Sequence, residues 1–91
     1  MRAKETIGHL VNLAMKSKKL SDQMNELGYP DNPYWDFYCE AAEALYDLVG
    51  ESTDTFEESL AFLVLQSTTI TEEQRINVLL YHYKKNKAEK K

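Results

Sequence analysis

Apolar residues in the first part of the chain recur at the spacing of a helix. The first four occupy positions i, i+3, i+4 and i+7 and so lie on one helical face: Ile7, Leu10, Val11 and Ala14. This pattern predicts a helix over residues 3–19. A second short helix, or a continuation of the first, then extends to Leu27, and Ser21 is a candidate N-cap for a restart.

The sequence GYPDNP interrupts this pattern, because a proline cannot continue a helix. Asn32 followed by Pro33 marks a new helix start, since Asn caps free amides and proline is well tolerated at the first helical position. The next helix is therefore predicted over residues 33–49. Gly50 follows at the position where a left-handed residue commonly ends a helix.

The predicted helix 33–49 is apolar around most of its circumference. At 100° per residue its four carboxylates fall within about 60° of one another and form one acidic stripe: Asp36, Glu40, Glu43 and Asp47. A helix that is otherwise apolar is typical of a central position, packed on several sides. We therefore expect Trp35, Phe37 and Tyr38 to lie in the core. The stripe itself is a solvated face, a ridge that meets a partner, or a pair of metal-binding or catalytic carboxylates.

Capping-box patterns, in which Thr precedes Glu or Gln by three positions, begin the remaining helices. They pair Thr55 with Glu58, Thr69 with Glu72, and Thr71 with Gln74. The third helix contains the run LAFLVL at 60–65, which is apolar on every side and is either wholly buried or part of a dimer interface. The fourth helix is predicted from about residue 72 to at least residue 85.

Together these elements predict an all-α protein, a compact bundle of four to five short helices with helix 33–49 at its centre. Ninety-one residues form one domain, 1–91, with a single modest core. No run of 18 or more apolar residues occurs, and the N-terminal segment lacks a continuous signal-peptide core. We therefore expect a cytoplasmic protein that has no membrane partner.

Charge divides the chain into basic ends, 1–20 and 81–91, and an acidic middle, 21–73. Each end carries five Lys or Arg residues against one Glu. Between residues 20 and 74 there are thirteen Asp or Glu and no Lys or Arg. Either the ends pack against the middle and neutralise it, or one strongly negative surface is available to a basic partner.

Motifs for catalysis or cofactor binding are absent from the sequence. Neither His9 nor His82 follows a Glu by three positions, as a di-iron helix bundle requires, and both are expected to be partly buried structural residues. Cys39 is the only cysteine and is expected to act as a small core residue. With no phosphate-binding loop and no nucleophile elbow, we predict no enzyme activity, no cofactor and no metal.

The leading hypothesis is a non-enzymatic protein-protein interaction module. It would be a small regulator or inhibitor, typical of phages and mobile elements, that docks the stripe on a basic partner surface. One alternative is a nucleic-acid-binding homodimer that uses lysines of both ends, namely Lys16, Lys18, Lys19, Lys84, Lys85 and Lys87. A second alternative is a purely structural homo-oligomer.

Overall fold

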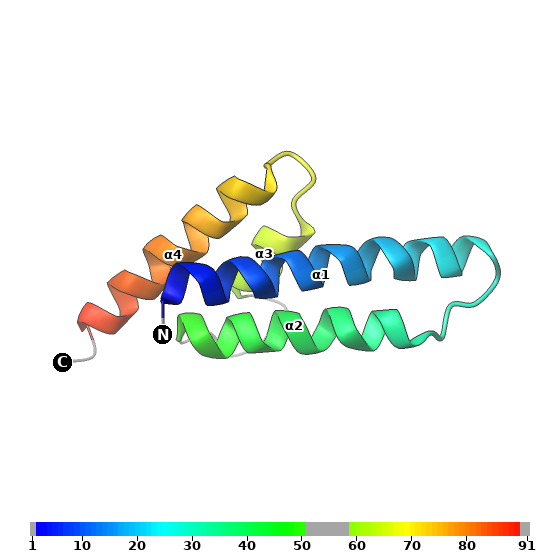
Figure 1. Ribbon diagram of the computed structural model, residues 1–91, viewed down its shortest axis with the longest axis horizontal. Helices are drawn as coiled ribbons and strands as arrows, with labels where there is room; N and C mark the ends of the chain where they lie inside the picture. The colour runs from blue at the N-terminus through cyan, green and yellow to red at the C-terminus, as the bar shows by residue number, and fades with distance from the viewer. Residues whose placement is uncertain (1, 51–58, 90–91) are drawn as a thin grey trace.

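The computed structural model describes residues 2–50 and 59–89, and every regular element within them is a helix (Figure 1). The helices are α1 (Ala3–Glu26), α2 (Pro33–Val49), α3 (Leu60–Gln66) and α4 (Glu72–Glu89). The described residues contain no strand, so the predicted all-α class and the number of helices are confirmed.

α1 is one continuous helix, so of the two alternatives the continuation is confirmed and Ser21 does not cap a restart. Three small side chains on α1 are buried at three- and four-residue spacing: Ala14, Ser17 and Ser21. Helices pack closely where such small side chains meet the neighbouring helix, and α1 makes its most extensive contacts with α2. Ser21 therefore belongs to the α1–α2 interface. Its small side chain fits between the two helices there, and it does not cap a helix.

α2 begins and ends at the predicted residues. The Asn32 side-chain oxygen accepts a hydrogen bond from the Trp35 amide at 3.2 Å, and Pro33 occupies the first helical position. Gly50 adopts φ 75°, in the left-handed region where a side chain would be strained. The Asn86 side chain of α4 donates a hydrogen bond of 2.9 Å to the Val49 carbonyl, which ties the end of α2 to α4.

α3 is a short helix whose N-cap is Ser59. The Ser59 hydroxyl accepts a hydrogen bond from the Phe62 amide at 3.1 Å. The predicted box of Thr55 and Glu58 lies outside the described residues. Within the run 60–65, Ala61, Val64 and Leu65 are buried, whereas Leu63 is 57% exposed. The run therefore supplies the core on one side of α3 only.

α4 begins with one of the two predicted capping boxes. The Thr71 amide donates to the Gln74 side chain at 2.8 Å, and the Gln74 amide donates to the Thr71 hydroxyl at 3.1 Å. The next residue, Arg75, is buried, and its guanidinium donates to the Val64 carbonyl at 3.2 Å and to the Ser67 carbonyl. These carbonyls lie at the C-terminus of α3, where positive charge is favoured.

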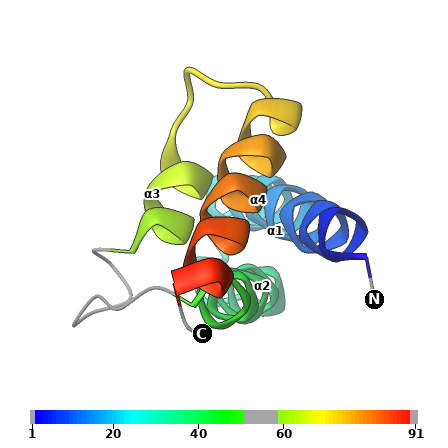
Figure 2. The same ribbon diagram turned by 90° about the vertical axis from the view of Figure 1, so that its left-hand side faces the viewer.

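The four helices are arranged as a long hairpin with two helices packed across one part of it. α1 and α2 run antiparallel, and α3 and α4 cover the half of the hairpin that contains the start of α1 and the end of α2 (Figures 1 and 2). α2 contacts all three other helices, as expected of a central helix, and α1 does so too. The other half of the hairpin extends past α3 and α4, and the molecule measures 48 × 27 × 25 Å.

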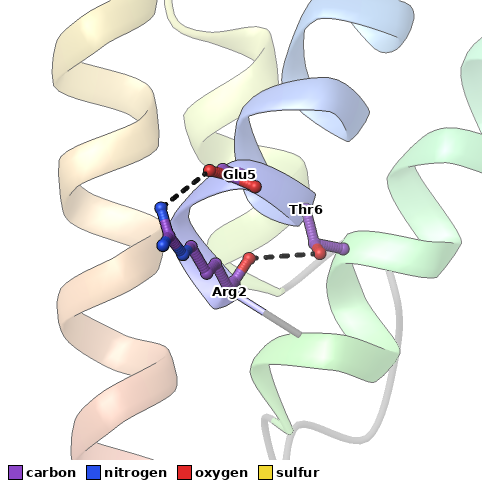
Figure 3. A network of polar contacts seen from close by, with 3 residues as sticks. All are labelled: Arg2, Glu5 and Thr6. Carbon is purple, nitrogen blue, oxygen red and sulfur yellow. Dashed lines mark hydrogen bonds and ion pairs between the residues drawn. The ribbon is translucent and has the colours of Figure 1, made fainter.

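Replacing Arg75 with alanine should lower the free energy of unfolding by about 2–3 kcal/mol, because the Val64 and Ser67 carbonyls lose a charged donor. Urea denaturation followed by circular dichroism measures this change. The control is Arg2→Ala, since the Arg2 side chain is 85% exposed and forms an ion pair with Glu5 across a single helical turn (Figure 3). That control should change stability by no more than about 0.5 kcal/mol. Equal effects of the two substitutions would contradict a clamping role for Arg75.

Candidate functional site

The four carboxylates of α2 lie on its outward side. Asp36, Glu40, Glu43 and Asp47 are all exposed, and we call them the acidic face. The buried residues of α2 are on the opposite side, about 180° away: Tyr38, Ala41, Ala42, Leu45 and Val49. The acidic face is therefore a straight row of carboxylates about 16 Å long, held on a helix whose other side is anchored in the core.

None of these four carboxylates has an ion-pair partner among the described residues. The ion pair found in that part of the chain joins Arg2 to Glu5 at 3.5 Å, within the first turns of α1 (Figure 3). The described lysines of the two ends therefore leave the acidic face uncompensated at contact distance. Its negative charge is directed toward solvent.

The aromatic residues at the start of α2 are not all in the core. Tyr38 is buried as expected, but Trp35 is 45% exposed and Phe37 is 46% exposed, so the prediction that both lie in the core is wrong. The physical reason is the arrangement of the helices. Tyr38 is the residue of this group that α3 reaches, since its hydroxyl accepts a hydrogen bond from the Gln66 side chain at 2.9 Å, whereas the first turn of α2 extends past α3 and α4 toward the hairpin tip (Figure 1).

Trp35 and Phe37 flank the acidic face at the hairpin tip. Each is adjacent in sequence to Asp36 and therefore lies about 100° from it around the helix, on opposite sides. Each ring also packs on a neighbour: Phe37 lies edge-on to Tyr34 at 6.2 Å between ring centroids, and Trp35 lies 5.4 Å from Tyr38. The two rings are thus held in place while presenting nearly half of their surface to solvent.

More apolar surface occurs at the same end of the molecule. Leu27 is 72% exposed and Tyr29 is 59% exposed, in the connection between α1 and α2. Sequence reasoning missed this tip because periodicity reports which side of a helix is apolar, whereas burial depends on what covers that side. Helix length was the available signal, since α1 spans about 36 Å and α3 only about 10 Å.

The lysines of α1 and α4 that were proposed for nucleic-acid contact lie in two places. α1 and α4 meet near Gly8, where Ile76 Cδ1 is 3.8 Å from the position a Cβ on that glycine would occupy. Beyond this contact α1 continues toward the hairpin tip and α4 toward the opposite end (Figure 1). Lys16 follows Gly8 by about 12 Å along α1, and Lys84 follows Ile76 by about 12 Å along α4.

The individual lysines are mostly exposed. Lys16, Lys19, Lys84, Lys85 and Lys87 are exposed, and Lys18 is partly buried. Lys87 also lies over the Tyr83 ring, with its nitrogen 5.7 Å from the ring centroid. The six lysines proposed for nucleic-acid contact are therefore divided between two separate places.

The remaining candidate groups are Cys39 and the two histidines. Burial raises the pKa of the Cys39 thiol, and the nearby charges of Asp36 and Glu43 raise it further, which disfavours a reactive thiolate. His82 is partly buried and meets Tyr81 edge-on at 5.2 Å between ring centroids. His9 is exposed, so its expected partial burial is wrong.

The described residues offer no site for a metal and no membrane span. They contain no group of three or more His, Cys, Asp or Glu side chains placed to hold a metal ion. Among the helices of the same residues, none combines the length and the apolar content needed to cross a membrane. The acidic face can thus contribute charge, hydrogen-bond acceptors and adjoining aromatic surface, which are the means of recognition.

Comparison with known proteins adds no relative. No protein-family model matches the chain, and neither the curated proteins nor the solved structures contain a significant match.

The free energy of unfolding should decrease at alkaline pH because of the Tyr38 hydroxyl, which lies where α2 meets α3. Burial raises the pKa of the Tyr38 hydroxyl above its ordinary value of 10.0, while the 2.9 Å hydrogen bond from the Gln66 side chain opposes that shift. Folded protein then holds this proton at pH values where unfolded chains release it. The stability linked to this group is complete below pH 10 and decreases as the pH rises above 10.

Urea denaturation of the wild-type protein and of the variant Tyr38→Phe, with midpoints measured between pH 8 and pH 11, tests this expectation. Because the variant lacks the hydrogen bond from Gln66, its free energy of unfolding at pH 8 should be about 0.5–1.5 kcal/mol lower than that of the wild type. Above pH 10 its stability should decline less steeply, because it has no hydroxyl to titrate. Parallel declines of the two proteins would mean that Tyr38 does not contribute to the alkaline transition.

Proposed function

We propose that this protein is a non-enzymatic interaction module that docks the acidic face of α2, with Trp35 and Phe37 beside it, on a basic surface of a partner protein. The observation that carries the proposal is the row of four exposed carboxylates without an ion-pair partner among the described residues. The exposed rings at the end of the row provide a second, apolar component.

These two components act at different stages of binding. A strong negative potential attracts a positively charged partner and accelerates the encounter, an effect that weakens as salt increases. Partly exposed aromatic rings provide most of the binding energy in many interfaces, because they bury a large apolar area with few rotatable bonds. A partner with an apolar pocket next to Lys or Arg side chains would satisfy both components.

Such docking also explains how a small protein without catalytic groups would regulate another protein. Covering a basic surface blocks whatever acidic ligand that surface binds, and nucleic acid is one such ligand. The proposal is therefore a regulator or inhibitor that acts by occupying the surface.

The nucleic-acid-binding alternative has less support from the geometry. Its lysines lie in two groups that extend in opposite directions from the contact between Gly8 and Ile76. The acidic face, in contrast, would repel phosphates.

A defined probe tests the electrostatic component. The probe is a labelled 20-residue helical peptide with lysines at positions i, i+4, i+7 and i+11, matching the carboxylate row, and leucines beside them. Replacing the row with Asp36→Asn, Glu40→Gln, Glu43→Gln and Asp47→Asn should weaken binding about tenfold or more at low salt, since each exposed pair contributes about 0.3–1 kcal/mol. Fluorescence anisotropy at several salt concentrations measures this change.

A matched control removes the same amount of charge elsewhere. It combines Asp22→Asn, Glu26→Gln, Glu72→Gln and Glu73→Gln, four exposed carboxylates of α1 and α4. If the control variant loses as much affinity as the acidic-face variant, the peptide senses only net charge and the proposed docking surface is wrong.

The aromatic component has its own readout, because Trp35 is the only tryptophan of the chain. Docking should move its fluorescence emission to shorter wavelength as the ring leaves water. Removing Phe37 with Phe37→Ala should weaken peptide binding by about 1 kcal/mol or more, roughly fivefold, without lowering its salt dependence. Tyr81→Ala, which removes an exposed ring on α4, serves as control and should leave both measurements unchanged.

A further inference from the structure

An exposed aromatic ring lies between two lysines on the outward side of α4. Tyr81 is 63% exposed, and Lys84 and Lys85, one turn further along the helix, are exposed as well. Around the helix these lysines lie about 60° and 40° from Tyr81, on opposite sides of it. Gln74 and Asn77, in the two preceding turns, are also exposed and lie within about 40° of Tyr81. We call these five residues the α4 face.

The α4 face lies on the side of the helix away from the core. Leu79, which is buried, lies about 160° around the helix from Tyr81. The His82 ring meets the Tyr81 ring with 5.2 Å between the ring centroids and an angle of 87° between the ring planes. This contact holds the Tyr81 ring beside the helix, while most of its surface remains open to solvent.

Positive charge dominates at the α4 face, although the whole chain carries a net charge of −4. Neither Lys84 nor Lys85 has an ion-pair partner among the described residues. The carboxylates in the first turn of α4, Glu72 and Glu73, lie about 12 Å or more before Tyr81 along the helix. That separation exceeds the Debye length of about 8 Å at physiological salt. The α4 face therefore combines two unpaired cations with a ring and contains no carboxylate of its own.

The start of α1 adds two cations at the same end of the molecule. α1 meets α4 where Gly8 faces Ile76, and from there the start of α1 and the second half of α4 extend toward the same end (Figure 1). Arg2 and Lys4 are exposed on that part of the chain. Arg2 pairs with Glu5, whereas Lys4 has no ion-pair partner among the described residues. Lys4 therefore extends the positive potential beyond α4.

We propose that the α4 face binds single-stranded nucleic acid, with a base stacked on Tyr81 and the adjacent phosphates held by Lys84 and Lys85. A single strand alternates flat bases with negative phosphates, so it uses both the ring and the lysines. Proteins that bind single strands without sequence preference combine aromatic rings that stack on bases with cations that follow the backbone. A duplex fits less well, because its bases are stacked on one another and present no free ring surface to Tyr81.

This surface is distinct from the two sites considered above. It uses neither the acidic face of α2 nor the lysines at 16–19, and it needs no second copy of the chain. Tyr81 adds specificity that lysines alone lack, because stacking contributes about 1–3 kcal/mol per base, whereas two lysines hold any polyanion. The proposal is independent of acidic-face docking, since Tyr81→Ala is expected to leave binding of the lysine-rich peptide unchanged.

Fluorescence anisotropy of a labelled strand of about 12 thymidines, measured with the full chain at low salt, tests the stacking component. The wild-type protein should bind, and Tyr81→Ala should weaken binding about fivefold or more, the loss expected for one stacked base. Tyr81→Phe, which keeps a ring, should retain the affinity within about twofold. A strand of the same length without bases should bind more weakly, and its affinity should be the same for the wild-type protein and Tyr81→Ala.

The salt dependence of binding tests the lysines. Lys84→Ala combined with Lys85→Ala should lower the slope of log affinity against log salt by about 1.4, because two phosphate contacts are lost. The matched control, Lys16→Ala with Lys19→Ala, removes two exposed lysines of α1 and should leave the slope unchanged. Circular dichroism confirms that the variants retain their helices.

Three results would overturn the proposal. Absence of binding to the thymidine strand at low salt would remove the site. Equal affinity of the wild-type protein and Tyr81→Ala, or of strands with and without bases, would mean that the lysines hold any polyanion. Equal changes in the two double-lysine variants would mean that net charge, and not the α4 face, governs binding.

Discussion

The close packing of α1 on α2 is the constraint on which the rest of the structure depends. The buried small residues Ala14, Ser17 and Ser21 leave room for α2 to approach α1 along several turns. The hairpin therefore holds together along its length, although α3, with only seven residues, is too short to cover more than part of it. One half of the molecule consists of three or four packed helices and the other half of two. The exposure of Trp35 and Phe37 follows from that difference.

Features that depend on neighbouring residues were predicted well from the sequence. Asn32 and Gly50 define the ends of α2, and Thr71 with Gln74 forms the reciprocal cap of α4, because each arises from hydrogen bonding or backbone geometry within a few residues. Ser21 shows the limit of such reasoning. Serine suits both a helix start and a tight helix-helix contact, and only the packing partner distinguishes them. The outward direction of the acidic stripe was open for the same reason, since periodicity aligns four carboxylates without saying what lies opposite.

The relation between the basic ends and the acidic middle was decided by how α4 crosses the hairpin. α4 passes α1 near Gly8 and reaches the end of α2, where the Asn86 side chain donates a hydrogen bond to the Val49 carbonyl. Arg75, the one cation between residues 20 and 83, is used inside the molecule, where it binds carbonyls at the end of α3. Among the described residues no cation forms an ion pair with the acidic face, although Lys87 lines the same pocket as Asp47 at its end. No composition-based argument distinguishes this outcome from neutralisation.

The anchoring of α2 makes its outward side well suited to recognition. The helix is capped by Asn32 at its start. At its end Gly50 turns the chain, and the Asn86 side chain donates a hydrogen bond to the Val49 carbonyl. Its inner side is held by contacts with all three other helices. The carboxylates on its outer side therefore keep a fixed spacing in the free protein, and little backbone entropy is lost when a partner binds. Under the proposed function, such a row would also discriminate between partners, because only cations placed in the same register meet every carboxylate at once.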